Sequence, residues 1–459
     1  MTVAVAGGIA LAFGVGVALL RRLLPRGAAI VGLVGLGATA AVGLLIRPDD
    51  LLSFGTTSLA GSGTVRALAV LWGASGAALV AIEVLAFRSA AVASPALIGL
   101  GTAILGLGST DPGAGVAFLA AGGVATVVAP AVAAGRTRAA VAWRALRAVV
   151  ISAVVALGVI AWERSPAGPL SVAFVDEAID PAAGAAIGLG FIGIVVAVML
   201  RTGAIPAHVW AARLVEAIPA AAVPAVLAWG GAAFALVAGG WALSGLGPVA
   251  GALVLERGAV AVVAGFTLLM ASTAALIHDD IDHVVGYSIV ADAGVVLFAF
   301  ASLDPAAAGP LATWALAYAT VKTGLAAWAS AIRGRFGARR LSELAGWAHR
   351  APILAVALGC IAVGAVGVPG TAAWAARAGL VTGAVGSPLD AVAVIGAGIS
   401  GLVIARVFAA GLRRPTRAVE ADPGDRAWRR APRATVVASL VLGLALLGAA
   451  VSLGVGSVA

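Results

Sequence analysis

The chain has 459 residues, of which 62% are hydrophobic and 11% charged, and its mean hydropathy is +1.11. These values exclude a water-soluble globular protein of this size and predict an all-α, polytopic membrane protein. The formal net charge of +9 does not indicate a nucleic-acid partner, because arginines in the loops between apolar runs carry almost all of it. We expect the lipid bilayer to be the main surrounding of the chain.

The numbers and positions of cysteine and histidine limit which disulfide, cluster and metal sites this chain can form. The single cysteine, Cys360, excludes an intramolecular disulfide framework and a cysteine-ligated cluster. The four histidines are scattered, and none has the spacing of a metal motif. We therefore expect no cofactor and no metal in this chain, and we assign any redox chemistry to a partner.

Taken in chain order, the apolar runs predict about fourteen transmembrane helices. The first run lacks a basic region before it and is followed by Arg21 and Arg22, which is typical of a transmembrane helix rather than a cleaved signal peptide. The fourth is short and rich in glycine, so the count stays open by one. The predicted spans are 3–20, 28–46, 66–87, 92–108, 114–134, 145–162, 182–212, 220–243, 258–277, 284–302, 308–332, 351–380, 386–410 and 433–456.

Two of these runs, 182–212 and 351–380, are too long for one simple crossing, and proline interrupts each. Pro206 lies in the first, and Pro369 with flanking glycines lies in the second. Broken helices are tolerated at membrane depth where they face protein or water, and breaks in two halves suggest inverted repeats. We therefore predict two inverted five-helix repeats with discontinuous helices 7 and 12.

No linker long enough to separate soluble domains occurs, so we treat residues 1–459 as a single integral membrane domain. Its expected parts are three N-terminal helices (1–90), a first repeat of helices 4–8 (92–243), a second repeat of helices 9–13 (258–410) and a C-terminal helix 14 (433–456).

Loop arginines concentrate after odd-numbered helices, which places those loops in the cytoplasm. Both termini are then expected on the non-cytoplasmic side of the cell inner (plasma) membrane, which the chain crosses many times. The arginine-rich stretch 413–433 fits a lipid-binding or partner-docking element, but its simplest interpretation is an ordinary cytoplasmic loop.

Three basic residues lie in or beside the apolar runs. Lys322, the only lysine, lies mid-helix and is costly there unless it faces a polar interior. Arg377 has apolar residues on both sides. Arg201 ends the run "GFIGIVVAVMLR", so it is either a buried cation or an interfacial arginine that extends to the headgroups.

Two acids are candidates for buried groups. Asp292 falls well inside the tenth predicted helix, whereas the polar stretch 278–283 before it most simply caps that helix in water. Glu83 lies near the end of the third helix, and it is either a carboxylate on an ion path or half of an interfacial pair with Arg88. A line of buried acids and bases can move protons through ordered water.

Several of these segments resemble the antiporter-like membrane subunits of complex I (NADH:quinone oxidoreductase), membrane-bound hydrogenases and multisubunit sodium/proton antiporters. "RTGAIPAHVWAARLVEAIPAAAVPAVL" is similar to the seventh-helix signature, with Arg201 in the place of its lysine and His208 after the break. "LAYATVKTGLAAW" puts Lys322 on the eleventh-helix lysine, and "GVPGTAAWAARAGLV" puts Arg377 on the twelfth-helix lysine. "LIHDDIDHVVGYSIVADAGVVLFAF" resembles the segment that leads to Ala-Tyr-Ser. The resemblance covers roughly residues 182–410.

The resemblance implies a membrane subunit of a proton-translocating complex, with a proton path along Arg201, His208, Lys322, Arg377, Glu83 and Asp292. The chain would contact other membrane subunits and move protons or sodium ions as part of a redox-driven translocase or an antiporter. In this reading the arginines set the electrostatics of the channel, because a guanidinium stays protonated.

The chain departs from the family pattern in ways that weaken the pumping inference. The family's fifth helix carries a glutamate, but "GVAFLAAGGVATVVAPAVAAG" has no acid, and the basic residue of the eighth helix is also absent. Glu83 lies two helices too early to replace that acid. Two alternatives therefore remain: a structural membrane module that does not pump, and a stand-alone secondary transporter that binds a small solute at the broken helices.

Overall fold

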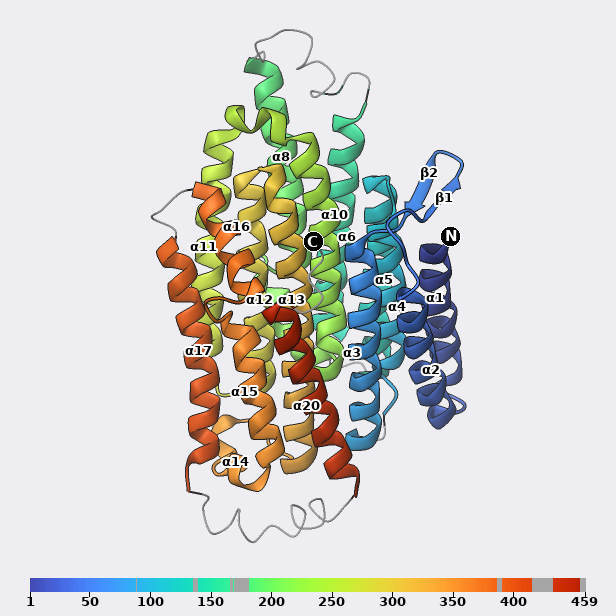
Figure 1. Ribbon diagram of the computed structural model, residues 1–459, viewed down its shortest axis with the longest axis vertical. Coiled ribbons are helices and arrows are strands. Elements are labelled where there is room, and N and C mark those ends of the chain that lie inside the picture. Colours follow the sequence, from blue (N-terminus) through green and yellow to red (C-terminus); the bar gives the residue numbers. More distant parts are fainter. Residues whose placement is uncertain are drawn as a thin grey trace.

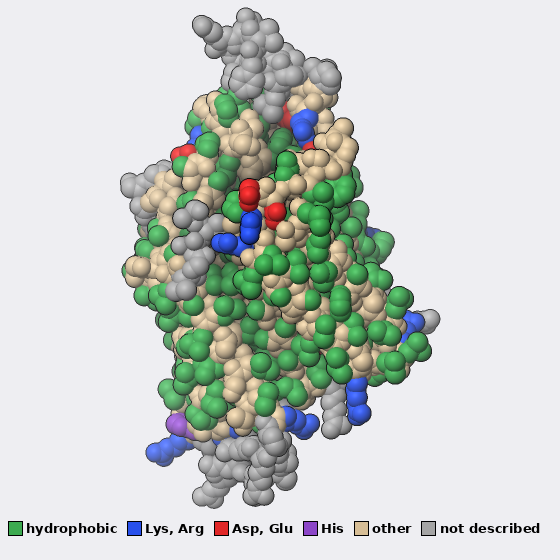
Figure 2. Space-filling view, turned by 45° about the vertical axis from the view of Figure 1, so that its right-hand side comes forward, with side chains coloured by type: hydrophobic (Ala, Val, Ile, Leu, Met, Phe, Trp, Pro, Cys, Tyr) green, Lys and Arg blue, Asp and Glu red, His purple; other side chains and the backbone are tan. Residues whose placement is uncertain are grey.

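The computed structural model describes residues 1–87, 89–134, 139–165, 168, 181–385, 390–414 and 432–454. Nearly all of this part of the chain is helical (Figure 1). Within it, ten helical segments are long and apolar enough to cross a membrane, and three further apolar helices are shorter. Hydrophobic side chains cover most of the face in Figure 2, whereas several Lys and Arg side chains gather at its lower end. The prediction of a helical, multi-pass membrane protein is confirmed.

The N-terminal part of the chain forms one side of the molecule (Figure 1). Its helices pack on their neighbours in sequence and α1 also packs on α4, while several contact later helices, as α3 does with α13 and α20, introduced below. The helices are α1 (Thr2–Leu20), α2 (Pro25–Gly43), α3 (Gly63–Phe87), α4 (Ala93–Gly108), α5 (Pro112–Ala134) and α6 (Ala139–Glu163).

A short antiparallel hairpin between α2 and α3 was not predicted. Its strands are β1 (Leu51–Phe54) and β2 (Thr57–Ala60), with Leu51 opposite Ala60. This hairpin is a local addition to the predicted all-α fold. The stretch "LLSFGTTSLA" has the sequence pattern of a β hairpin, because two four-residue runs flank a two-residue turn with glycine.

The middle of the chain contains the first predicted break. Its elements are α8 (Pro181–Thr202), α9 (His208–Ala217), a 3₁₀ turn (Ala220–Ala222), a π-helical segment (Pro224–Trp229), α10 (Gly230–Gly245), a 3₁₀ segment (Gly247–Leu253) and α11 (Val254–Ile277). Gly203, whose φ is 72°, and the exposed Pro206 separate α8 from α9. The predicted break in 182–212 is therefore confirmed.

The C-terminal part contains the second break. Its elements are α12 (Ile281–Ser302), a 3₁₀ turn (Pro305–Ala307), α13 (Ala308–Phe336), a 3₁₀ turn (Leu341–Glu343), α14 (Trp347–Arg350), α15 (Pro352–Val366), α16 (Ala372–Val385), α17 (Asp390–Leu412) and α20 (Pro432–Leu453). The break between α15 and α16 contains Gly367, Pro369 and Gly370, as predicted.

Helices α12 and α13 form the centre of the bundle. They contact each other, and between them they contact α3, α9, α10, α11, α15, α16 and α20. Residues 314–332 of α13 and 289–302 of α12 are buried without interruption. A helix that is apolar on all sides belongs in the interior, so any charge within these two stretches is withdrawn from both lipid and water.

Candidate functional site

The centre of the site is a buried ion pair between the two central helices. The Lys322 Nζ atom in α13 lies 2.9 Å from the Asp292 Oδ2 atom in α12, and both side chains are 2% exposed. Each residue lies near the midpoint of its helix. Because an isolated charge at this depth would be very costly, each group makes the burial of the other possible.

Trp314 links this pair to the adjoining second break. Its Nε1 donates a hydrogen bond to the backbone carbonyl of Asp292 at 3.0 Å. The guanidinium carbon of Arg377 lies 5.5 Å from the centre of the Trp314 ring, within the range of a cation–π contact. Trp314 precedes Lys322 by eight residues, so both side chains occupy the same face of α13.

Arg377 is completely buried in α16, just beyond the second break. Its Nη1 donates to the carbonyl of Val366, the last residue of α15, at 3.3 Å. In the described part of the chain its Nε and Nη2 have no hydrogen-bond partner. The break thus supplies a free helix-end carbonyl to this cation, and Asp292 is the carboxylate whose charge acts on it.

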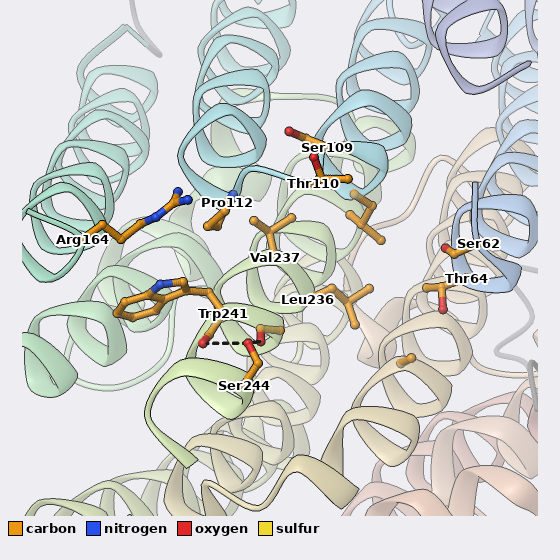
Figure 3. Close-up of a pocket in the computed structure, with 13 residues that line it drawn as sticks. Ser62, Thr64, Ser109, Thr110, Pro112, Arg164, Leu236, Val237, Trp241 and Ser244 are labelled. Atoms are coloured by element: carbon orange, nitrogen blue, oxygen red, sulfur yellow. Dashed lines mark hydrogen bonds between the residues drawn. The ribbon is translucent and has the colours of Figure 1, made fainter. Parts of the chain in front are cut away.

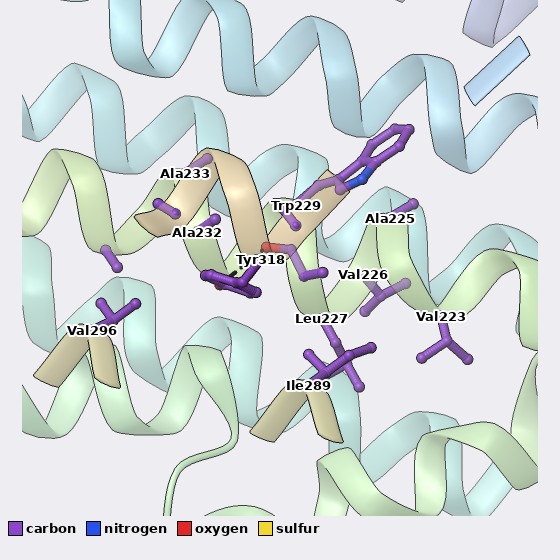
Figure 4. Packing of buried hydrophobic residues seen from close by; sticks show 14 of the residues in the cluster. Val223, Ala225, Val226, Leu227, Trp229, Ala232, Ala233, Ile289, Val296 and Tyr318 are labelled. Carbon is purple, nitrogen blue, oxygen red and sulfur yellow. Dashed lines mark hydrogen bonds between the residues drawn. The ribbon is translucent and has the colours of Figure 1, made fainter. Parts of the chain in front are cut away.

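Tyr318 lies on the same face of α13, one turn before Lys322, and its ring centre lies 6.3 Å from that of Trp314. Its hydroxyl donates to the carbonyl of Ala228 at 3.3 Å, and Figure 4 shows its ring beside the π-helical segment. The charges of both Asp292 and Arg201 act on this phenol. Tyr318 therefore links the face of α13 that carries Lys322 to the π-helical segment Pro224–Trp229.

Arg201 lies in the last turn of α8 and is 2% exposed. Its Nη1 donates to the carbonyl of Val226 at 3.0 Å. An interfacial arginine that extends to the headgroups does not fit this burial. Arg201 and Tyr318 both bond to carbonyls of the π-helical segment Pro224–Trp229, where the wider turn and Pro224 disturb the regular hydrogen-bond ladder.

Two glycines make room for the Arg201 guanidinium. A Cβ atom at Gly230 would lie 2.1 Å from its Nη2, and one at Gly123 of α5 would lie 3.2 Å away. Within the described residues, Arg201 pairs with a backbone carbonyl and with no carboxylate. The fifth helix thus presents a glycine to this cation, in agreement with the absence of an acid in its sequence.

The structure does not bring the other two predicted site residues to the ion pair. His208 is the first residue of α9 and is half-buried; its Nδ1 has no hydrogen-bond partner in the described part of the chain. Glu83 is 4% exposed in α3, and the charge that acts on it is that of Arg333, near the end of α13. Arg88, its predicted interfacial partner, lies outside the described residues.

A charged network surrounds the start of α12. Asp280 caps the helix, because its side chain accepts a hydrogen bond from the backbone N–H of Asp282 at 2.8 Å. The predicted cap is confirmed. The expectation that this stretch lies in water is wrong for Asp282, which is completely buried and lies 2.9 Å from Arg333 and 3.1 Å from Arg339.

Histidines extend this network to α9. His283 Nε2 lies 3.4 Å from Glu216 Oε1, and its ring stacks on His278 at 5.1 Å. Burial and the neighbouring His283 lower the pKa of His278. Burial opposes ionisation of Asp280, but His283 and the charge of Arg339 outweigh it and hold the pKa of Asp280 below its ordinary value. This end of α12 therefore holds several titratable groups in contact with one another.

Sequence reasoning missed Tyr318 and Trp314. Both could have been found by their spacing of four and eight residues before Lys322, which puts them on the helix face of that lysine. It also missed the carbonyls of the π-helical segment, because no side chain marks them.

Fold and site together define a polytopic helical membrane protein with a charged interior beside two discontinuous helices. The chain belongs to the family described as "NADH:quinone oxidoreductase/Mrp antiporter, TM", which matches residues 135–403. This match contains all of the buried ion pair and both broken helices, and it confirms the family resemblance.

Curated relatives agree with this assignment. NADH-quinone oxidoreductase subunit N of Geobacillus kaustophilus is 30% identical over 207 residues, which are 42% of this chain and 40% of that protein. Subunit N 1 of Streptomyces griseus is 33% identical over 222 residues, which are 47% of this chain and 45% of that protein. The matched stretch therefore spans less than half the length of each relative.

Solved structures show the same fold over nearly the whole chain. A chain of the membrane-bound sulfane sulfur reductase, an archaeal respiratory membrane complex, gives a TM-score of 0.74 at 14% identity and covers 99% of this chain and 98% of that one. A chain of the Mrp complex from Dietzia sp. gives 0.68 at 16% identity, with 98% and 95% coverage. Respiratory complex I from Thermus thermophilus gives 0.65 at 18% identity, with 97% coverage of both chains.

Proposed function

We propose that this chain is a proton-translocating membrane subunit of a multisubunit complex, of the NADH:quinone oxidoreductase or cation/proton antiporter type. The family match and the subunit N relatives support this assignment. Other membrane subunits are its proposed partners, and protons or sodium ions its cargo. Redox chemistry and quinone binding belong to partner chains.

The observation that carries the proposal is the Lys322–Asp292 pair at 2.9 Å in the centre of the bundle. A lysine gains and loses its proton within reach of burial and neighbouring charges, whereas an arginine does not. In this proposal Lys322 carries the proton and Asp292 stabilises its charged form. Arg201 and Arg377 act as fixed positive charges on either side of this pair. They raise the free energy of placing a further cation beside it.

Tyr318 extends the proposed path toward Arg201. Its hydroxyl bonds to the Ala228 carbonyl, and it can donate or accept a proton through an ordered water. A buried line of Lys322, Tyr318 and water reaches from the central pair toward the first broken helix. His208, beyond the break, is the proposed next acceptor, whereas Glu83 belongs to the network around Arg333.

A polar cavity of about 470 Å³ offers an aqueous vestibule at one end of the bundle (Figure 3). Ala312 lines it and lies ten residues before Lys322 in α13, a rise of about 15 Å. The ion pair between Arg164 and Asp111 lies beside it. Its polar lining residues are Ser62, Thr64, Ser109, Thr110, Arg164 and Ser244.

We further propose fourteen crossings and two inverted five-helix repeats, with both termini on the non-cytoplasmic side of the inner membrane. The described helices fit fourteen crossings when α8 with α9, the segments 220–245, and α15 with α16 each count once. The vestibule residues then all lie at non-cytoplasmic helix ends, and the arginine-rich loops lie opposite, as the positive-inside rule requires.

One observation favours a second candidate function, a structural module that does not pump. Arg201 faces Gly123 of the fifth helix and bonds to a carbonyl, so no proton-exchanging acid stands beside it. In that case the central pair would only hold α12 and α13 together. A stand-alone transporter has less support, because small apolar residues surround both breaks.

Transport measurements separate these candidates. The full chain is reconstituted in liposomes, a potassium diffusion potential is imposed, and a trapped pH dye reports proton uptake. We expect uptake by the wild type and a loss of about tenfold or more in Lys322→Ala, with the exposed Arg22→Gln as control. Equal uptake by wild type and Lys322→Ala would remove Lys322 from the path and favour the structural module.

A further inference from the structure

A second, separate feature lies on the outer surface, where α20 crosses α3. A groove of about 550 Å³ runs between the two helices, and its lining is almost entirely apolar. The lining residues are Ala74, Ala78, Thr435, Val436, Ser439, Leu440, Gly443, Leu444 and Leu447. In Figure 1, α20 passes over the bundle beside α3 and α13, so this groove faces the surrounding membrane.

A smaller cavity adjoins the groove at the start of α20. This cavity, of about 140 Å³, lies between α15 and α20 and shares one lining residue, Thr435, with the groove. Arg335 and Arg350 line it. Their guanidinium carbons lie 5.2 Å and 4.4 Å from the centre of the Phe336 ring, which holds the two positive charges near each other.

Two helix N-termini also meet at the small cavity. The first residues of α15 (Pro352, Ile353 and Leu354) and of α20 (Ala434 and Thr435) contribute to its lining. The N-cap of α15, Ala351, has no side-chain cap hydrogen bond. Because the first N–H groups of a helix lack intrahelical partners and carry partial positive charge, these ends favour a phosphate oxygen.

This surface therefore has an apolar part, the groove, and a positively charged part, the small cavity. An apolar groove adjoins, at Thr435, a cavity that two arginines and two helix N-termini line, at the end of the bundle that carries the proposed cytoplasmic loops. Basic pockets between transmembrane helices on that side suit lipid phosphates, and the adjoining groove suits an acyl chain. A free anion would need the cavity but not the groove.

We propose that this surface, formed by α3, α15, α20 and Arg335, binds one anionic phospholipid, with its phosphate at Arg335 and Arg350 and an acyl chain between α3 and α20. The bound lipid fills the seam between the N-terminal helices and the central bundle. This inference is independent of whether the chain conducts protons.

Two variants test the two halves of the site. Arg335→Gln with Arg350→Gln removes the charges. Gly443→Leu places a bulky apolar side chain in the groove at a position where a Cβ meets no atom within 4 Å. The matched controls are Arg22→Gln with Arg26→Gln, two exposed arginines, and Gly398→Leu, an exposed helical glycine with equally open space.

The readout is lipid retention by the full chain in native mass spectrometry. The purified protein is incubated with phosphatidylglycerol or phosphatidylcholine of identical acyl chains. We expect the wild type to retain phosphatidylglycerol about tenfold better. The double arginine variant should lose this preference yet still bind both lipids, and Gly443→Leu should retain less of either. Both controls should behave as the wild type.

Several outcomes would overturn the proposal. One is equal retention of the two lipids by the wild type, and another is an unchanged preference in the double arginine variant with an unchanged melting temperature. If Gly443→Leu retains both lipids as the wild type does, the cavity binds only a free anion or the groove holds a protein partner.

Discussion

At the scale of single residues, the burial of Lys322 and the burial of Asp292 depend on each other, because each charge compensates the other. Asp292→Asn leaves a buried ammonium without a carboxylate, and we expect it to lower the free energy of unfolding by about 3–5 kcal/mol. Replacing both residues, as Asp292→Leu with Lys322→Met, should cost less than either single change. Thermal unfolding in detergent measures Asp292→Asn, the double variant and each of its two single changes.

The solvent-exposed pair Arg164–Asp111 serves as the control for the Lys322 and Asp292 variants. Arg164 is 54% exposed, and Asp111 is 28% exposed. For a solvent-exposed pair, Asp111→Asn should change the free energy of unfolding by no more than about 1 kcal/mol. Additive effects at Lys322 and Asp292 would show that the two side chains do not stabilise each other.

The sequence identified both members of the central pair but not their contact. Each residue is a lone charge in a long apolar run, and such a charge needs an interior partner. Which partner it finds depends on how α12 and α13 are rotated against each other, and apolar faces on all sides leave that rotation undefined. Tyr318 was missed because a tyrosine in an apolar helix carries no charge to mark it.

At the scale of elements, the first broken helix depends on Gly203. Its φ of 72° is unfavourable for other residues, and an added Cβ would lie 2.3 Å from that of Ala211 in α9. Gly203→Ala should therefore destabilise the protein by about 1–3 kcal/mol and shift Arg201 relative to Val226.

The melting temperature of the Gly203→Ala variant in detergent checks this expectation. Gly258→Ala in α11 is the matched control, because a Cβ there meets no atom within 4 Å, and alanine favours a helix. An equal melting temperature for Gly203→Ala and wild type would mean that the break adapts without strain.

Both breaks were predictable from sequence, whereas the π-helical segment and the β hairpin were not foreseen. Proline and glycine in an apolar run too long for one crossing mark a break directly. The π-helical segment depends on tertiary hydrogen bonds from Arg201 and Tyr318 to its carbonyls. The hairpin was overlooked because its two strands are only four residues each.

At the scale of the whole molecule, the proposed orientation places the vestibule outside and the arginine-rich loops inside. The single native cysteine allows a simple test in a Cys360→Ala background. Ser244→Cys, at the vestibule, should react with an impermeant maleimide in right-side-out vesicles only, and Arg413→Cys in inside-out vesicles only. The reverse labelling pattern would invert the proposed topology.

The central claim is that Lys322 releases and regains a proton, and Lys322→Arg tests it most directly. Arginine keeps the positive charge opposite Asp292 but does not give up its proton. In the liposome assay, proton uptake by Lys322→Arg should therefore fall as far as in Lys322→Ala, with a melting temperature close to that of the wild type. Uptake by Lys322→Arg at the wild-type rate would contradict the account, because a fixed charge would then suffice at this position.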